Sequence, residues 1–182
     1  MRLFTFANFL TFLRLFLAPV IAVLIFNGLW NWAFLCFLLA ATTDFLDGFL
    51  ARLFKEESRW GAFWDPIADK LFLLTCFGVL SFVSLNIPLW FLCLLFFREI
   101  LILGGSFFLL IYQKRSRIQP LIWGKLNTFF QLLFLGGLFV DKFYHFFPRV
   151  SQQYAIIFLT FFSIFSFLKY LQRGLEMYFY KK

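Results

Sequence analysis

Six apolar stretches, each about as long as a bilayer is thick, dominate the sequence. They cover roughly residues 7–27, 30–52, 62–84, 88–112, 123–141 and 150–172. A helix that crosses the hydrocarbon core needs about 20 residues. With 63% hydrophobic and 14% charged residues, the chain carries more apolar surface than a globule of 182 residues can bury. We therefore expect an all-α polytopic membrane protein with six transmembrane helices, in which residues 1–182 form a single domain.

The charges in the connections between these stretches are strongly asymmetric. In three alternate connections, the only Lys or Arg residues are Lys142 and Arg149. The opposite side receives Arg2, Arg52, Lys55, Arg59, Lys114, Arg115, Arg117, Lys125, Lys169, Arg173, Lys181 and Lys182. The positive-inside rule then predicts that both termini are cytoplasmic. The net charge of +8 indicates affinity for anionic lipid headgroups. It does not indicate nucleic-acid binding, because the basic residues alternate with spans and form no single soluble patch.

Acidic side chains gather where the second stretch ends and the third begins. Asp44 and Asp47 are three residues apart and therefore share one helical face, whereas Asp65 and Asp69, four apart, share another. The short connection between the stretches predicts antiparallel helices with both carboxylate faces at the cytoplasmic end. Asp inside a span costs about 2.5–3.5 kcal/mol on translocon-type scales, so such residues are functional by default.

Four converging carboxylates in a low dielectric have to be protonated, paired or neutralised by cations. All-oxygen ligands suit hard ions such as Mg²⁺ or Mn²⁺, and two metals that share carboxylates are a common way to activate a phosphoryl centre. The alternative is a set of structural salt bridges from these acids to Arg52, Lys70 and Arg98. The four acidic positions, with small residues between them, favour the metal site.

The spacing D-x2-D-G-x2-A-R-x8-G-x3-D-x3-D resembles the motif of the CDP-alcohol phosphotransferase family. Every position of that motif is matched here, by Asp44, Asp47, Gly48, Ala51, Arg52, Gly61, Asp65 and Asp69. The resemblance also covers the six-span layout. It implies transfer of a phosphatidyl group from CDP-diacylglycerol to a small alcohol, with release of CMP, by an enzyme that uses two divalent cations. It further implies a bacterial inner (cell) membrane location and a homodimer.

The resemblance also implies a role for each residue of the motif. Asp44, Asp47 and Asp65 look like metal ligands. Asp69 looks like the general base, and it is expected to touch the second metal as well. The residues expected to bind or make room for the CDP moiety are Gly48, Ala51, Arg52, Ser58 and Gly61.

The acceptor alcohol is less constrained. The runs Asn8–Arg14, Asp65–Lys70, Arg98-Glu99 and Gly124–Thr128 look like phosphatidylglycerophosphate synthases, which accept sn-glycerol 3-phosphate. A dianionic acceptor phosphate needs cations nearby, and the candidates are Arg98, Arg117 and Lys125. The runner-up is a cardiolipin synthase that uses phosphatidylglycerol, because residues 118–133 resemble that branch as well.

A membrane transporter is a competing hypothesis from another class. Transporters keep their intramembrane acids near the bilayer midplane beside broken helices, whereas the acids here cluster at one membrane face. Two arginines stay open from sequence alone. Arg98 either pairs with Glu99 between helices or binds the acceptor. Arg14 either snorkels to the interface or approaches the active site.

Overall fold

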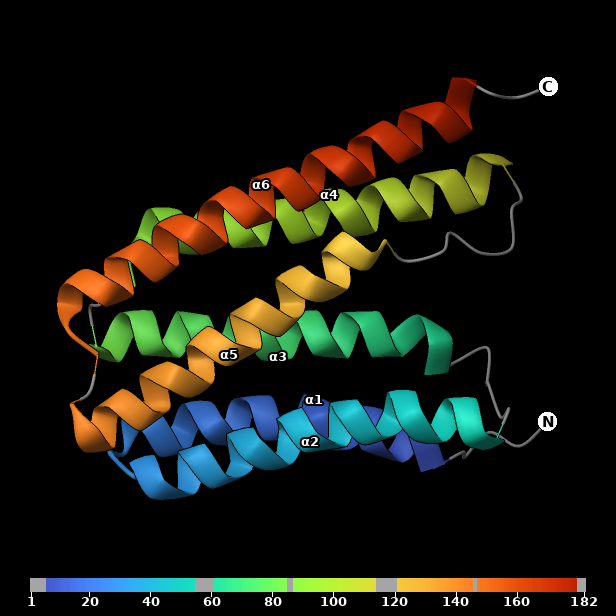
Figure 1. Cartoon of the computed structure of the whole chain (residues 1–182). Coiled ribbons are helices and arrows are strands. Elements are labelled where there is room, and N and C mark those ends of the chain that lie inside the picture. Colours follow the sequence, from blue (N-terminus) through green and yellow to red (C-terminus); the bar gives the residue numbers. More distant parts are fainter. Residues whose placement is uncertain (1–5, 55–60, 85–86, 114–120, 146, 180–182) are drawn as a thin grey trace. The chain divides into compact units, whose positions relative to one another are not determined.

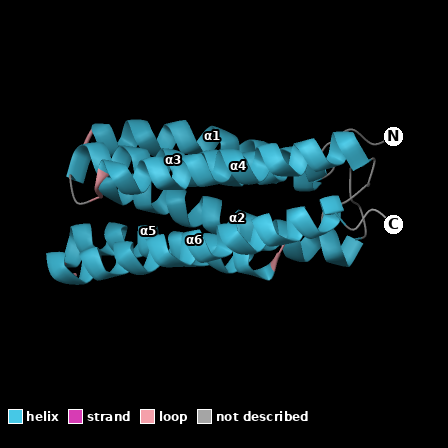
Figure 2. Cartoon of the chain, turned by 90° about the horizontal axis from the view of Figure 1, so that it is seen from above, coloured by secondary structure: helices cyan, strands magenta, loops and turns pink. Residues whose placement is uncertain are grey.

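The computed structural model describes residues 6–54, 61–84, 87–113, 121–145 and 147–179, and these residues form six α-helices. In chain order the helices are α1 (Phe6–Phe26), α2 (Trp30–Phe54), α3 (Gly61–Ser84), α4 (Leu89–Gln113), α5 (Ile122–Tyr144) and α6 (Arg149–Phe179) (Figure 1). Figure 2 shows that all regular structure in the described part is helical. The predicted all-α class is therefore confirmed, and each helix coincides with one of the six apolar stretches.

The chain divides into two compact units. The first unit contains residues 1–86 and 135–146, so it holds α1, α2, α3 and the C-terminal part of α5. The second unit contains residues 87–134 and 147–182, with α4, the N-terminal part of α5 and α6.

The first unit begins with a tight helical hairpin of α1 and α2. Gly28 has a φ of 73°, a left-handed conformation that costs glycine little. Its backbone N–H donates to the carbonyl of Ile25 at 3.0 Å, and the N–H of Leu29 donates to Leu24 at 2.9 Å. This is a Schellman cap, which satisfies the last carbonyls of α1 and turns the chain into α2.

Aromatic packing holds the interior of the first unit together. Phe37 of α2 is buried and stacks on Phe72 of α3, with ring centroids 5.9 Å apart. It also meets Phe139 of α5, at 5.1 Å. At the end where α2 begins, the Lys142 ammonium lies 4.7 Å from the ring centre of Trp30, a cation–π contact. The C-terminal end of α5 and the N-terminal end of α2 therefore lie at the same end of this unit.

In the second unit, α4 and α6 pack together. Helix α5 contacts α6 through aromatic rings. Trp123 lies edge-on to Phe165 at 5.1 Å, and Phe130 lies edge-on to Phe158 and Phe162 at 5.4 and 5.3 Å. Edge-to-face pairs of this kind add to the stabilisation that burial gives. These rings fix the N-terminal part of α5 against α6.

Large apolar side chains are exposed on all six helices. Phe16 of α1 is 68% exposed, Phe82 of α3 is 69% exposed and Phe161 of α6 is 72% exposed. Polar residues such as Arg14, Arg98 and Asn127 are buried instead. Soluble monomers rarely expose continuous apolar surface of this extent. The distribution fits a chain whose outer surface faces lipid.

Within the described part of the chain, one helix is long and apolar enough to cross a membrane by length and composition, Arg149–Glu176 in α6. Two shorter apolar helices, Thr11–Phe26 and Trp30–Thr43, fall below that length. Six membrane crossings and cytoplasmic termini therefore remain predictions.

Candidate active site

The four motif aspartates lie on α2 and α3, as the sequence predicts. Asp44 and Asp47 belong to the C-terminal part of α2, and Asp65 and Asp69 belong to the first turns of α3. Figure 1 shows that α2 ends and α3 begins at the same end of the first unit, where α1 also begins. The backbone therefore brings the two halves of the motif to one end of a three-helix group.

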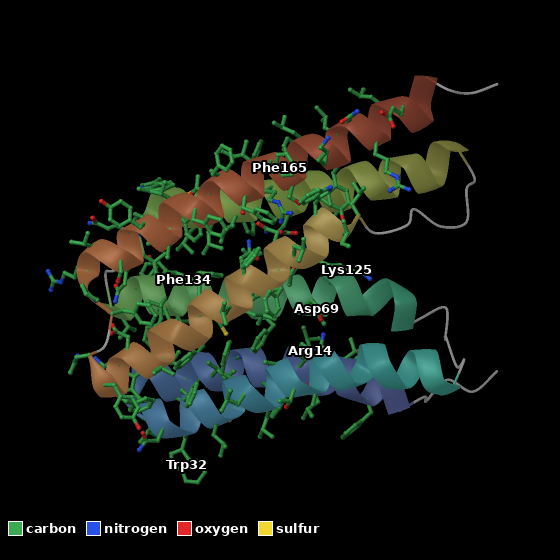
Figure 3. The ribbon with its side chains drawn as sticks, in the orientation of Figure 1. Arg14, Trp32, Asp69, Lys125, Phe134 and Phe165 are labelled. Atoms are coloured by element: carbon green, nitrogen blue, oxygen red, sulfur yellow. The ribbon has the colours of Figure 1, made fainter. Side chains whose placement is uncertain are left out.

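Asp69 is the motif aspartate whose side chain the structure describes. Its Oδ1 forms an ion pair with Nη1 of Arg14, which lies on α1. Figure 3 shows the two side chains pointing toward one another between the two helices. The Arg14 side chain is 3% exposed and that of Asp69 is 30% exposed. The sequence left the position of Arg14 open between the membrane interface and the active site, and the structure places it beside the predicted base.

The ion pair between Arg14 and Asp69 can be compared with the alternative in which the four acids form structural salt bridges. Asp69, the acid whose side chain is described, is paired with Arg14 on α1 and not with one of the three cations named in that alternative. Arg98 instead pairs with its neighbour Glu99 in the second unit, and its Nη2 donates to Ser166 Oγ at 3.0 Å. Both Arg98 and Glu99 are buried. Pairing of Arg98 is therefore confirmed, whereas its contact with an acceptor remains a prediction.

A second buried polar contact joins α5 and α6. Ser163 Oγ donates to Asn127 Oδ1 at 2.9 Å, and both residues are completely buried. Within the described residues, the buried Nδ2 of Asn127 and Nε2 of Gln131 have no hydrogen-bond partner. Buried polar atoms are normally satisfied by protein or water. Two polar side chains of α5, Asn127 and Gln131, are thus buried in the second unit.

Tyr170 of α6 holds the start of α5. The backbone N–H of Leu121 donates to the Tyr170 hydroxyl oxygen at 3.2 Å, and the ring lies against Gly124. A Cβ at residue 124 would lie 2.5 Å from that oxygen and 2.9 Å from Cε2 of the same ring. Gly124 stands in the run that resembles the family, but sequence reasoning missed its partner, because the two residues are far apart in the chain.

We expect Gly124→Ala to destabilise the protein by about 1–3 kcal/mol, the usual cost of overpacking. The added methyl group has to displace the Tyr170 ring from the start of α5. Thermal unfolding in detergent measures the effect. Gly78→Ala is the matched control, because no atom in the described part of the chain lies within 4 Å of that added Cβ. Tyr170→Ala should remove most of the penalty in the double variant. Wild-type stability of Gly124→Ala would show that the contact is not tight.

The remaining candidate residues fall into three groups. The first group lies on α2 and α3, but its side chains are outside the described part: Gly48, Ala51, Arg52 and Gly61. The same holds for the side chains of Asp44, Asp47 and Asp65. Ser58 and Arg117 lie outside the described residues. Lys125 is exposed near the start of α5 in the second unit (Figure 3). The approach of Arg98 and Lys125 to the carboxylates therefore stays a prediction.

Among the described side chains, no group of three His, Cys, Asp or Glu residues comes together. Three of the four motif carboxylates lie outside that set. The chemistry of the full donor set, carboxylate oxygens at two helix ends, suits Mg²⁺ or Mn²⁺. The residues present therefore fit a hard divalent cation.

The family model for CDP-alcohol phosphatidyltransferase matches residues 4–167. The chain belongs to this membrane-associated family and is an enzyme of that class. The match includes residues of both units. It also covers all four motif aspartates and Arg14.

Several relatives carry more specific names. The chain is 40% identical over 140 residues to a CDP-diacylglycerol--glycerol-3-phosphate 3-phosphatidyltransferase of Cereibacter sphaeroides, a match that covers 73% of this chain and 62% of the relative. It is 33% identical over 178 residues to the protein of the same name from Aquifex aeolicus, covering 94% and 97%. It is also 35% identical over 155 residues to a cardiolipin synthase (CMP-forming) / mitochondrial hydrolase fusion protein of Schizosaccharomyces pombe, covering 77% and 26%.

Proposed function

We propose that this chain transfers the phosphatidyl group of CDP-diacylglycerol to sn-glycerol 3-phosphate, giving phosphatidylglycerophosphate and CMP. The observation that carries the proposal is the complete aspartate motif on α2 and α3, in a chain whose relatives from Cereibacter and Aquifex bear the name of that activity. We propose further that residues 1–182 act as one catalytic domain, which the family match over residues 4–167 supports.

In the proposed reaction, the hydroxyl oxygen of the acceptor attacks the β-phosphorus of CDP-diacylglycerol. A new phosphorus–oxygen bond forms there, and the bond from that phosphorus to the bridging oxygen breaks. CMP leaves with the bonding electron pair, and Asp69 takes the proton of the attacking hydroxyl. A positioned carboxylate base of this kind contributes about 10²–10⁴-fold to a rate.

We propose that Asp44, Asp47 and Asp65, with a contribution from Asp69, hold two divalent cations. When bound, Mg²⁺ or Mn²⁺ supplies positive charge that stabilises the pyrophosphate oxygens as the bond to CMP breaks. The chain's own residues position the substrate. Gly48, Ala51 and Gly61 leave room for the nucleotide, and Gly48, Arg52 and Ser58 contact the CDP moiety.

Arg98, Arg117 and Lys125 are the proposed contacts of the acceptor phosphate. Support comes from the second unit, where Arg98 is held by Glu99 and Ser166 and Lys125 is solvent-accessible at the start of α5. These contacts fix the position of the buried Arg98, and a guanidinium group suits a phosphate. The tie between Tyr170 and Leu121 keeps the helix start that carries Lys125 in place.

We also propose six membrane crossings with both termini and the active site on the cytoplasmic side of a bacterial inner membrane. The exposed apolar side chains on every helix and the asymmetric basic residues support this arrangement. A homodimer is proposed as well. At Gly104 and Gly105 of α4, no atom of the described residues lies within 4 Å of an added Cβ, which leaves room for the close approach of a second helix.

Cardiolipin synthesis from phosphatidylglycerol is the second candidate, favoured by the Schizosaccharomyces pombe relative and by residues 118–133. An acceptor panel separates the two. Purified protein receives CDP-diacylglycerol with glycerol 3-phosphate, phosphatidylglycerol, serine or inositol phosphate, and CMP release is measured. We expect release with glycerol 3-phosphate, at least about 10-fold above phosphatidylglycerol. A site built for a small dianionic phosphomonoester should reject a bulky lipid whose phosphate is a monoanionic diester. Release with phosphatidylglycerol alone would assign the second function.

A further inference from the structure

We propose that Arg14 is a positioning residue for the catalytic carboxylate: it holds Oδ1 of Asp69, so that Oδ2 receives the proton of the acceptor hydroxyl. The inference rests on the proposed function, because it assigns the base role to Asp69. It adds a residue from α1, outside the aspartate motif, to the machinery of the reaction. The observation behind it is the ion pair between the two side chains in Figure 3.

Arg14 lies on the face of α1 that packs into the protein. Thr11, Arg14, Ala18, Ile21 and Ile25 are all buried, and their spacing of three and four residues marks one side of the helix. The other side, with Phe9, Phe12, Phe16, Val23 and Phe26, is exposed. An arginine that snorkels to the interface keeps its charged end in water. Arg14 is 3% exposed and points inward, so snorkelling does not explain its position.

Asp69 stands at the start of a buried stripe of α3. Leu73, Cys76 and Leu80 follow it at helical spacing, and all three are buried. Helix α1 packs against α3, which places the two charges at a helix–helix contact. A buried charge is strongly unfavourable unless it is paired. The pair therefore ties the orientation of the Asp69 carboxylate to the packing of two helices.

The two carboxylate oxygens of Asp69 are in different surroundings. Oδ1 faces Arg14 and is inaccessible, although 30% of the whole side chain is exposed. The accessible area therefore belongs to the rest of the side chain. A general base needs one oxygen within hydrogen-bond reach of the proton that it removes, in a fixed direction. That role falls to Oδ2 in this proposal, because Oδ1 is buried and held by Arg14.

The test combines kinetics with a double-mutant cycle. Arg14→Gln should lower kcat by about 10–100-fold, as expected for a misplaced catalytic group, with KM for CDP-diacylglycerol within about 2-fold of wild type. Arg14→Lys, which keeps the charge, should recover part of the loss. In an Asp69→Asn background, Arg14→Gln should cause little further loss. Arg149→Gln, at the exposed first residue of α6, is the matched control and should leave kcat unchanged.

Thermal unfolding in detergent with EDTA gives a readout that does not depend on turnover. Arg14→Gln and Asp69→Asn should each lower Tm, and the double variant should lower it by less than the sum, because the two side chains interact. The inference would be overturned if Arg14→Gln kept the wild-type kcat, or if only its KM changed. Fully additive losses of activity or of Tm in the double variant would also overturn it. If the wild-type protein releases no CMP with any acceptor, the proposed function fails instead, and the Tm cycle still tests the pair.

Discussion

Asp69→Asn should reduce CMP release from CDP-diacylglycerol by at least about 100-fold, because the amide cannot take the proton of the attacking hydroxyl. The fold should survive, since asparagine keeps the size of the side chain and an oxygen that accepts from Arg14. Initial rates of CMP formation at saturating substrate measure the loss. The assay uses a saturating concentration of divalent cation, because Asp69 is also proposed to contribute to the metal site. The effect should then fall on kcat, because the proton is transferred only in the reaction step.

A carboxylate-to-amide change elsewhere provides the control. Glu176 lies near the C-terminal end of α6, is exposed and accepts a hydrogen bond from Gln172 at 3.0 Å. Glu176→Gln should retain wild-type kcat within about 2-fold, as surface substitutions usually change little. If Asp69→Asn keeps wild-type kcat, Asp69 is not the base, and both the mechanism and the proposed role of Arg14 are wrong.

Removal of divalent cations should abolish turnover, and Asp65→Asn should weaken metal binding severely. Asp65→Asn removes a negatively charged ligand, so the attraction of the site for divalent cations falls. We expect activity in excess EDTA to fall by at least about 100-fold and to return on addition of Mg²⁺ or Mn²⁺. In Asp65→Asn the Mn²⁺ concentration for half-maximal activity should rise at least about 10-fold, a change within the range seen when metal sites are perturbed.

A direct measurement of Mn²⁺ binding distinguishes a variant that no longer binds metal from one that binds metal but no longer catalyses the reaction. The electron paramagnetic resonance signal of free Mn²⁺, titrated against purified protein, should show tight sites in the wild type and in Glu176→Gln. Asp65→Asn should bind fewer ions or bind them more weakly. If the wild type kept full activity in excess EDTA, the reaction would not require a divalent cation, whatever the variants do.

The helices were predictable from hydropathy, but their ends were less so. The predicted stretch 62–84 matches α3 (Gly61–Ser84) almost residue for residue. The stretch 150–172 stops short of α6, which runs to Phe179. Hydropathy marks where a chain leaves the hydrocarbon, whereas a helix can continue into the polar interface. Residues such as Arg173 and Glu176 therefore extend the helix beyond the predicted end.

The motif aspartates could be placed on two helices because helical spacing is a local property of the sequence. Partners on other helices could not be found in this way. An isolated arginine in an apolar stretch does not reveal which helix faces it, so the pairing of Arg14 with Asp69 required the packing of α1 on α3. The contacts of Tyr170 with Leu121 and of Ser163 with Asn127 were missed for the same reason.

The most direct test of the central claim is the stoichiometry of products formed by the purified wild-type protein. CDP-diacylglycerol, Mg²⁺ and sn-glycerol 3-phosphate are incubated with the protein, and CMP and phospholipid are quantified by mass spectrometry. We predict phosphatidylglycerophosphate and CMP in equal amounts, with neither formed when the acceptor is left out. CMP released equally without the acceptor, or no CMP with any alcohol supplied, would contradict phosphatidyl transfer by this chain.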